Sequence, residues 1–158
     1  MSRIQLALNV ENLDEAIDFY SKLFASNPAK VRPGYANFAI DEPPLKLVLI
    51  EGGGDPGTIN HLGVEVATTE EVTAATARLS GEGMDTLVED QTSCCFAVQD
   101  KVWVDSPDGS AWEIYTVLAD AETMGGGERC CTTESADSPT LITLSTSAPA
   151  CAPGGDCC

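Results

Sequence analysis

The chain has 158 residues, 43% of them hydrophobic, which is enough for one domain or two small fused modules with a real core. Its 25 acidic residues against 8 basic ones give a formal net charge of −17 at pH 7. Such a surface repels phosphate backbones and anionic lipids, so we expect neither a nucleic-acid partner nor a membrane partner. The first residues lack the apolar region of a signal peptide, and no apolar run is long enough to span a bilayer, so a cytoplasmic protein is expected.

Taken in chain order, the apolar pattern predicts the same series of elements twice. The first half alternates with period two over residues 4–10, has helical spacing over 12–24 with Asn12 as N-cap, and then predicts strands over 35–40 and 45–50. The second half predicts a strand over 60–66, a helix over 69–80 and strands over 87–90, 95–99, 101–105 and 111–118, with a turn at 107–109. Superimposing the two opening strands places Gln5 on His61. We therefore expect an α+β fold of two βαβββ modules, residues 1–56 and 57–119.

The composition changes near residue 119, after which large apolar residues become rare and Gly, Ser, Thr, Pro and Ala dominate. Residues 120–158 are therefore predicted to be a flexible tail that carries cysteines. Six of the seven cysteines form adjacent pairs, at 94–95, 130–131 and 157–158. Neighbouring cysteines rarely bridge each other, and vicinal thiols in a reducing compartment suggest soft-metal or metalloid chemistry. For the tail cysteines, incidental composition remains the alternative.

Two motifs connect the repeated modules with a known superfamily. The sequence N-H-L-G-V-E-V opens the second module at residues 60–66, and P-D-G-S-A-W-E-I-Y follows at 107–115. This arrangement resembles the vicinal-oxygen-chelate superfamily, which includes glyoxalase I, extradiol dioxygenases and bleomycin-resistance proteins. The resemblance implies a cupped mixed sheet that holds a divalent metal through Gln5, His61 and Glu113. The fourth superfamily position would fall near Lys46, which cannot ligate while protonated, so positions on the metal would stay open.

Longer motifs narrow the resemblance to one branch. Residues 1–10, 33–40, 43–49, 60–66, 94–104 and 112–115 are similar to the ArsI/CadI group, which comprises organoarsenical carbon–arsenic lyases and cadmium-induced proteins. The resemblance implies an Fe(II)-dependent dioxygenase that uses O2 to cleave the carbon–arsenic bond of trivalent organoarsenicals such as methylarsenite, releasing arsenite. Cys94 and Cys95 would bind the substrate, because arsenic carrying one organic group has two positions that thiolates can occupy. Both thiols can reach one arsenic only if this segment is a loop, since adjacent side chains of a strand point to opposite faces.

Several alternatives stay open. A lone strand histidine is often a hydrogen-bonded bystander, the amide of Gln5 is a weak donor, and Cys94 and Cys95 could pack as small hydrophobic residues. The main rival function is a cadmium-induced protein that binds soft metal without catalysis, through Cys94, Cys95 and the tail pairs. A general superfamily member acting on drugs or catechols would give the vicinal cysteines no role. Both modules lie in one chain, so either a monomer or a homodimer is expected.

Overall fold

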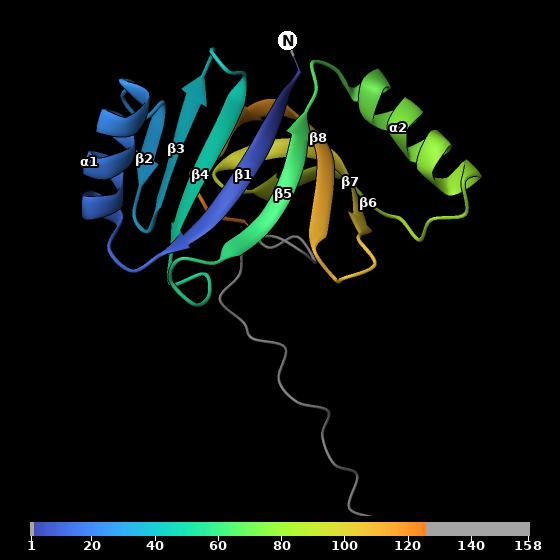
Figure 1. Ribbon diagram of the computed structural model, residues 1–158. Helices are drawn as coiled ribbons and strands as arrows, with labels where there is room; N and C mark the ends of the chain where they lie inside the picture. The colour runs from blue at the N-terminus through green and yellow to red at the C-terminus, as the bar shows by residue number, and fades with distance from the viewer. Residues whose placement is uncertain (1, 126–158) are drawn as a thin grey trace, which may run out of the picture.

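The computed structural model describes residues 2–125, and within them one curved sheet carries two helices (Figure 1). Its elements are β1 (Arg3–Val10), α1 (Leu13–Phe24), β2 (Lys30–Arg32), β3 (Tyr35–Ile40), β4 (Leu45–Glu51), β5 (Ile59–Glu65), α2 (Thr69–Gly81), β6 (Leu87–Cys94), β7 (Ala97–Asp105) and β8 (Ala111–Asp120). This order is βαβββ repeated twice, which confirms the predicted α+β fold. The part of the predicted cysteine tail from residue 126 onward lies outside the described residues.

The eight strands form a single mixed sheet in the order β2-β3-β4-β1-β5-β8-β7-β6. The opening strands of the two modules, β1 and β5, are antiparallel neighbours at its centre, with Gln5 opposite Gly63 and Ala7 opposite His61. Each opening strand is also parallel to the last strand of its own module, β1 to β4 and β5 to β8. The two modules are thus related across the β1–β5 pair, in agreement with the superposition of Gln5 on His61.

Each strand divides its side chains between a convex face, which the helices cover, and a concave face. On β1, Leu6, Leu8 and Val10 pack with the cluster that includes α1 residues, whereas Ala7 belongs to a separate cluster on the other face. In the second module, Val72 and Leu79 of α2 pack with Val102, and Figure 1 shows the two helices outside opposite ends of the sheet. The concave face is therefore free to carry polar side chains.

Both helices begin where the sequence places a capping residue. The side chain of Asn12 accepts a hydrogen bond from the backbone N–H of Glu15, as predicted. Thr68 and Glu71 form a reciprocal capping box at the start of α2. Within residues 2–125, neither helix combines the length and apolar character needed to cross a membrane.

The strands of the last hairpins differ from the prediction. The prediction left residues 91–94 between strands at 87–90 and 95–99. Residues 91–93 instead lie in β6, where Thr92 pairs with Gln99 of β7. The chain instead turns at Cys95 and Phe96, whose φ angles are +54° and +59°. Two left-handed residues make the tight hairpin turn that follows strand twist, a position usually marked by Asn or Gly. Cys and Phe carry no such signal, so the predicted end of the strand at residue 90 and the two strands predicted in place of β7 were wrong.

Candidate metal and dithiol site

Three neighbouring central strands bring Gln5, His61 and Glu113 together on the concave face. All three side chains are buried, and they come from β1, β5 and β8 respectively. Gln5 Nε2 lies 2.9 Å from His61 Nε2 and 2.6 Å from Glu113 Oε1. His61 Nε2 lies 3.3 Å from the same Glu113 oxygen. Three potential donors from distant parts of the chain thus converge on one point.

The imidazole of His61 is oriented from its other side. Its Nδ1 lies 2.7 Å from Asn60 Oδ1, an acceptor, so this nitrogen carries the proton and Nε2 offers its lone pair to the site. Asn60 is itself fixed, because its amide donates to Asn9 Oδ1 at 2.9 Å and to the Gly53 carbonyl at 3.2 Å. The tautomer that binds metal through Nε2 is therefore the one that this network favours.

The Glu113 carboxylate is paired with a buried lysine. Lys101 Nζ donates to Glu113 Oε2 at 2.7 Å, and the two side chains are 1% and 4% exposed. Burial raises the pKa of Glu113, but the charge and hydrogen bond of the Lys101 ammonium outweigh burial, and the pKa lies at about 2. The carboxylate is therefore ionised at neutral pH, and Oε1 remains directed at Gln5 and His61.

Tyr115 supports the amide of Gln5. Its hydroxyl donates to Gln5 Oε1 at 2.5 Å, and burial together with the Glu113 charge holds its pKa well above the ordinary value. A phenol that stays protonated can both donate and accept. If the carboxamide turns by half a rotation, Oε1 faces His61 and Glu113 while the amide N–H donates to the Tyr115 oxygen. Gln5 can therefore present its oxygen to a cation and still keep a hydrogen bond to Tyr115.

Gly63 packs closely against two of the three donor side chains. A Cβ added at this residue would lie 3.0 Å from Glu113 Cγ and 3.4 Å from Gln5 Cβ, so any larger residue would press on both side chains.

The register of the parallel strand pairs also corrects the fourth superfamily position. Glu113 pairs with Gly63, two residues after His61, and the equivalent place two residues after Gln5 is Ala7, which pairs with Val48 rather than Lys46. Valine cannot ligate, so the protein supplies three donors.

The chemistry of this donor set fits a divalent transition metal. Among residues 2–125 no three His, Cys, Asp or Glu side chains cluster as a metal site, and the third donor here is the neutral amide of Gln5. One imidazole nitrogen and two oxygens, one of them charged, suit a metal of intermediate softness such as Fe(II). Three protein donors leave coordination positions open for other molecules.

Cys94 and Cys95 lie at the turn between β6 and β7, and their sulfur atoms are 3.4 Å apart. The turn overcomes the strand geometry that would have separated the two sulfur atoms. Sulfur atoms about 2.3 Å from a shared soft atom span such a gap at a bond angle close to a right angle. Cys95 packs on the concave cluster that includes Ala7, the residue opposite His61. The two cysteines and the three converging donors therefore share one face of the sheet.

Neighbouring segments hold this hairpin turn in place. Phe96 is buried against Tyr35, with ring centroids 5.4 Å apart, and its carbonyl accepts hydrogen bonds from Lys30 Nζ at 2.9 Å and from the Ala121 N–H at 3.0 Å. The Cys95 N–H donates to the Met124 carbonyl at 2.7 Å. Lys30 also forms an ion pair with Asp120 at the end of β8. The turn is thus attached to the first module and to the segment after β8.

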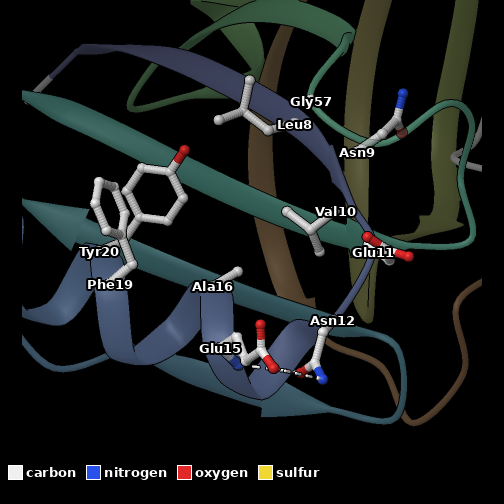
Figure 2. A pocket seen from close by; sticks show the side chains of 10 residues that line it. All are labelled: Leu8, Asn9, Val10, Glu11, Asn12, Glu15, Ala16, Phe19, Tyr20 and Gly57. Atoms are coloured by element: carbon white, nitrogen blue, oxygen red, sulfur yellow. Dashed lines mark hydrogen bonds between the residues drawn. The ribbon is translucent and has the colours of Figure 1, made fainter.

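A separate hollow lies across the sheet from these residues. Figure 2 shows it between α1 and the end of β1, lined by Leu8, Val10, Ala16, Phe19 and Tyr20 with polar residues around Asn12. Leu8 and Val10 belong to the face of β1 that α1 covers, whereas Gln5 and Ala7 belong to the other. The apolar lining of this hollow therefore lies on the opposite face of the sheet from Gln5.

Residue types alone did not single out Lys101, Tyr115, Trp103 and Asn60. The ring of Trp103 lies 5.5 Å from the His61 imidazole, edge to face, and 5.1 Å from Lys101 Nζ. Alternation on β7 places Lys101 and Trp103 on one face, and alternation on β8 does the same for Glu113 and Tyr115. This alternation was the signal in the sequence that could have pointed to these residues. Only the strand order shows that the two faces meet at the site.

Comparison with known proteins places this geometry in a family. The model of the Glyoxalase/Bleomycin resistance protein/Dioxygenase superfamily matches residues 3–114. A trivalent organoarsenical cleaving enzyme of Thermomonospora curvata is 52% identical over 161 residues, covering all of both chains. Cadmium-induced protein CadI of Mycobacterium bovis is 62% identical over 129 residues, which is 82% of this chain and 85% of that protein.

A solved structure shares the fold. The Mn(II)-bound glyoxalase from Novosphingobium aromaticivorans superimposes with a TM-score of 0.56 at 18% identity, over 81% of this chain and 44% of that one. Its fold is that of the superfamily which the family model identifies. The chain therefore belongs to the Glyoxalase/Bleomycin resistance protein/Dioxygenase superfamily and, within it, to the family of the CadI proteins and the trivalent organoarsenical cleaving enzymes.

Proposed function

We propose that the protein is an Fe(II)-dependent enzyme of the non-haem dioxygenase type that cleaves the carbon–arsenic bond of trivalent organoarsenicals such as methylarsenite. O2 would be the co-substrate and arsenite the inorganic product. The observation that carries the proposal is the position of the Cys94 and Cys95 sulfur atoms, 3.4 Å apart, on the same concave face as Gln5, His61 and Glu113. The 52% identity to a protein named as a trivalent organoarsenical cleaving enzyme, over the whole of both chains, supports the substrate class.

The dithiol would capture the arsenical by exchange. Methylarsenite, with two hydroxyls on arsenic, would react with the Cys94 and Cys95 thiols. Two sulfur–arsenic bonds would form and two arsenic–oxygen bonds would break, and the hydroxyls would leave with the thiol protons as two waters. A reducing compartment, such as the cytoplasm expected from the sequence, would keep both thiols reduced. The organic group would remain on arsenic as its third substituent.

The remaining residues would prepare the site for the cleavage step. Gln5, His61 and Glu113 would hold Fe(II), which when bound supplies the one-electron chemistry that activates O2. Asn60 would keep the lone pair of His61 directed at the ion, and Lys101 would keep Glu113 ionised. The hairpin turn would hold the carbon–arsenic bond close to the ion, where proximity provides much of the rate advantage. All these side chains come from one chain, so a monomer would suffice and a homodimer is equally compatible.

The test is anaerobic loading with Fe(II), followed by methylarsenite and then oxygen. Arsenite would be followed by chromatography with arsenic detection. We expect arsenite to appear only with both iron and oxygen, and Cys94→Ser and Cys95→Ser to remove it while iron binding persists. His61→Ala should remove iron binding while leaving arsenical capture by the thiols. Arsenite formation at an unchanged rate in Cys94→Ser would contradict the role of the dithiol.

The second candidate is a cadmium-induced protein that binds soft metal without catalysis. The 62% identity to a CadI protein and the close pair of cysteine sulfur atoms favour it. Under this alternative, cadmium or arsenic would bind tightly and stoichiometrically, and no arsenite would be released. The buried Gln5–His61–Glu113 set supports catalysis over storage, because a soft-metal store has no need of a second, oxygen-rich ion site.

A further inference from the structure

Gln99 carries a buried acceptor that no other group uses. Within residues 2–125, its side-chain oxygen Oε1 is the buried polar side-chain atom that has no hydrogen-bond partner. The residue is 4% exposed. A buried amide oxygen without a donor costs free energy, so its retention calls for an explanation.

The side chain of Gln99 points to the concave face. Along β7, Val102 and Val104 pack with the cluster of α2 on the convex side, and Asp100 accepts a hydrogen bond from Thr69 of α2 at 2.6 Å. Because side chains alternate along a strand, Gln99 shares the opposite face with Lys101 and Trp103. Gln99 therefore lies on the concave face, which also carries Gln5, His61 and Glu113.

The register places Gln99 between the dithiol and those donors. On β6 and β7, Cys94 pairs with Ala97 and Thr92 pairs with Gln99, so Gln99 is the diagonal neighbour of Cys94 on one face. In the other direction, Gln99 is two residues from Lys101, which holds Glu113. Its opposite neighbour on β8 is Val117, which is apolar. A molecule attached to the dithiol and extending toward Glu113 would pass over this amide.

We propose that Gln99 is a specificity-determining residue whose Oε1 accepts a hydrogen bond from the organic group of the bound arsenical. The inference rests on the proposed function, because the arsenical is the molecule held by Cys94 and Cys95. Both arsenic hydroxyls leave as water when the thiols bind, so the polar hydrogens that remain belong to the organic group. The substrates that fit best are trivalent arsenicals whose organic group carries an amino or hydroxyl donor, in preference to hydrocarbon groups of the same shape.

The test compares phenylarsenite with 4-aminophenylarsenite on the reduced protein without metal or oxygen. Titration calorimetry gives the two affinities, and dithiothreitol titrated with the same arsenicals corrects for the effect of the amino group on the arsenic itself. We expect the wild type to prefer the amino compound by roughly tenfold beyond the dithiothreitol ratio. Gln99→Met, which has similar length and no acceptor, should abolish this preference, whereas Gln99→Glu should retain it. Circular dichroism checks that the variants fold.

Each outcome has one meaning. A wild-type ratio equal to that of dithiothreitol overturns the inference, even if neither variant folds, and so does a preference that survives in Gln99→Met. These results leave the proposed lyase activity intact, because cleavage is measured separately with iron and oxygen. Absence of binding for both arsenicals would overturn the inference together with the role of the dithiol. Conversely, a lost cleavage activity with the expected affinity ratio would leave the Gln99 subsite supported.

Discussion

Replacing Lys101 with methionine tests the electrostatics of the site most directly. The Lys101 ammonium lies 2.7 Å from Glu113 Oε2, and neither side chain is more than 4% exposed. In Lys101→Met the carboxylate would keep the N–H of Gln5 but lose its only full positive partner within hydrogen-bond distance among the described residues. Burial would then dominate, and we expect the pKa of Glu113 to rise above its ordinary value of 4.5.

The size of the effect follows from the pKa and from the burial. A carboxyl held at a pKa of about 2 instead of 4.5 contributes about 3 kcal/mol to the free energy of unfolding at neutral pH. Breaking a buried ion pair on one side costs about 3–5 kcal/mol. The two values agree, so we expect Lys101→Met to lower the free energy of unfolding by about 3–5 kcal/mol at pH 7. For a chain of this length, that is a drop of roughly 6–20 °C in Tm.

Urea unfolding of the metal-free protein, followed by circular dichroism, measures this loss. Because the folded-state pKa of Glu113 is depressed, its stabilisation is present above pH 4.5 and disappears as the pH falls toward 2. The difference between wild type and variant should therefore shrink between pH 5 and pH 3. Lys22→Met is the matched control, since Lys22 forms an exposed ion pair with Asp18 and should cost less than about 0.5 kcal/mol. A loss below about 1 kcal/mol at pH 7, or one that does not change with pH, would refute the reasoning.

Three further changes probe the site and its hairpin. Gly63→Ala should lower the affinity for a divalent ion at least tenfold, because the new methyl group would occupy the space between the strands that carry the donors; calorimetry with Co(II) measures it. Asn60→Ala removes the partner of His61 Nδ1 and should weaken Co(II) binding by about 10- to 100-fold in the same assay. Lys30→Met removes one of the two donors to the Phe96 carbonyl, and we expect faster amide hydrogen exchange at the hairpin turn with little change elsewhere.

Controls for these changes come from the same chain. Gly81→Ala serves beside Gly63→Ala, since a Cβ at residue 81 would meet nothing within 4 Å. Equal Co(II) affinity of both glycine variants would contradict the expectation that a side chain at residue 63 disturbs the metal-binding residues. For the hairpin, Lys22→Met again provides an exposed lysine with an ion pair of its own. Identical exchange at the turn in both lysine variants would show that Lys30 does not hold it.

The repeated modules were predictable because each is recorded in local patterns. Period-two alternation, helical spacing and capping residues depend only on neighbours in the chain, and they predicted most elements within a few residues. The three-residue strand β2 was missed, since so short a segment has no period to detect. The match between Gln5 and His61 came from aligning the two modules, and the β1–β5 register agrees with it.

The hairpin turn was not predictable in the same way. Its central residues, Cys95 and Phe96, adopt left-handed backbone angles that their side chains disfavour, and contacts with Lys30, Tyr35 and Met124 hold them there. Those contacts come from segments tens of residues away or from the chain after β8. The position of the two thiols relative to each other is therefore a product of tertiary packing.

The sequence by itself determined the class of fold, the number of modules and the residue types that can bind a metal and a soft atom, because these follow from periodicity, motifs and chemistry. Only the tertiary structure decided that Lys101 neutralises Glu113, that Tyr115 and Asn60 support Gln5 and His61, and that Val48 takes the fourth position. Each of these depends on which strands are neighbours and in what register. Strand order and register arise from burial of the whole sheet, and no local segment encodes them.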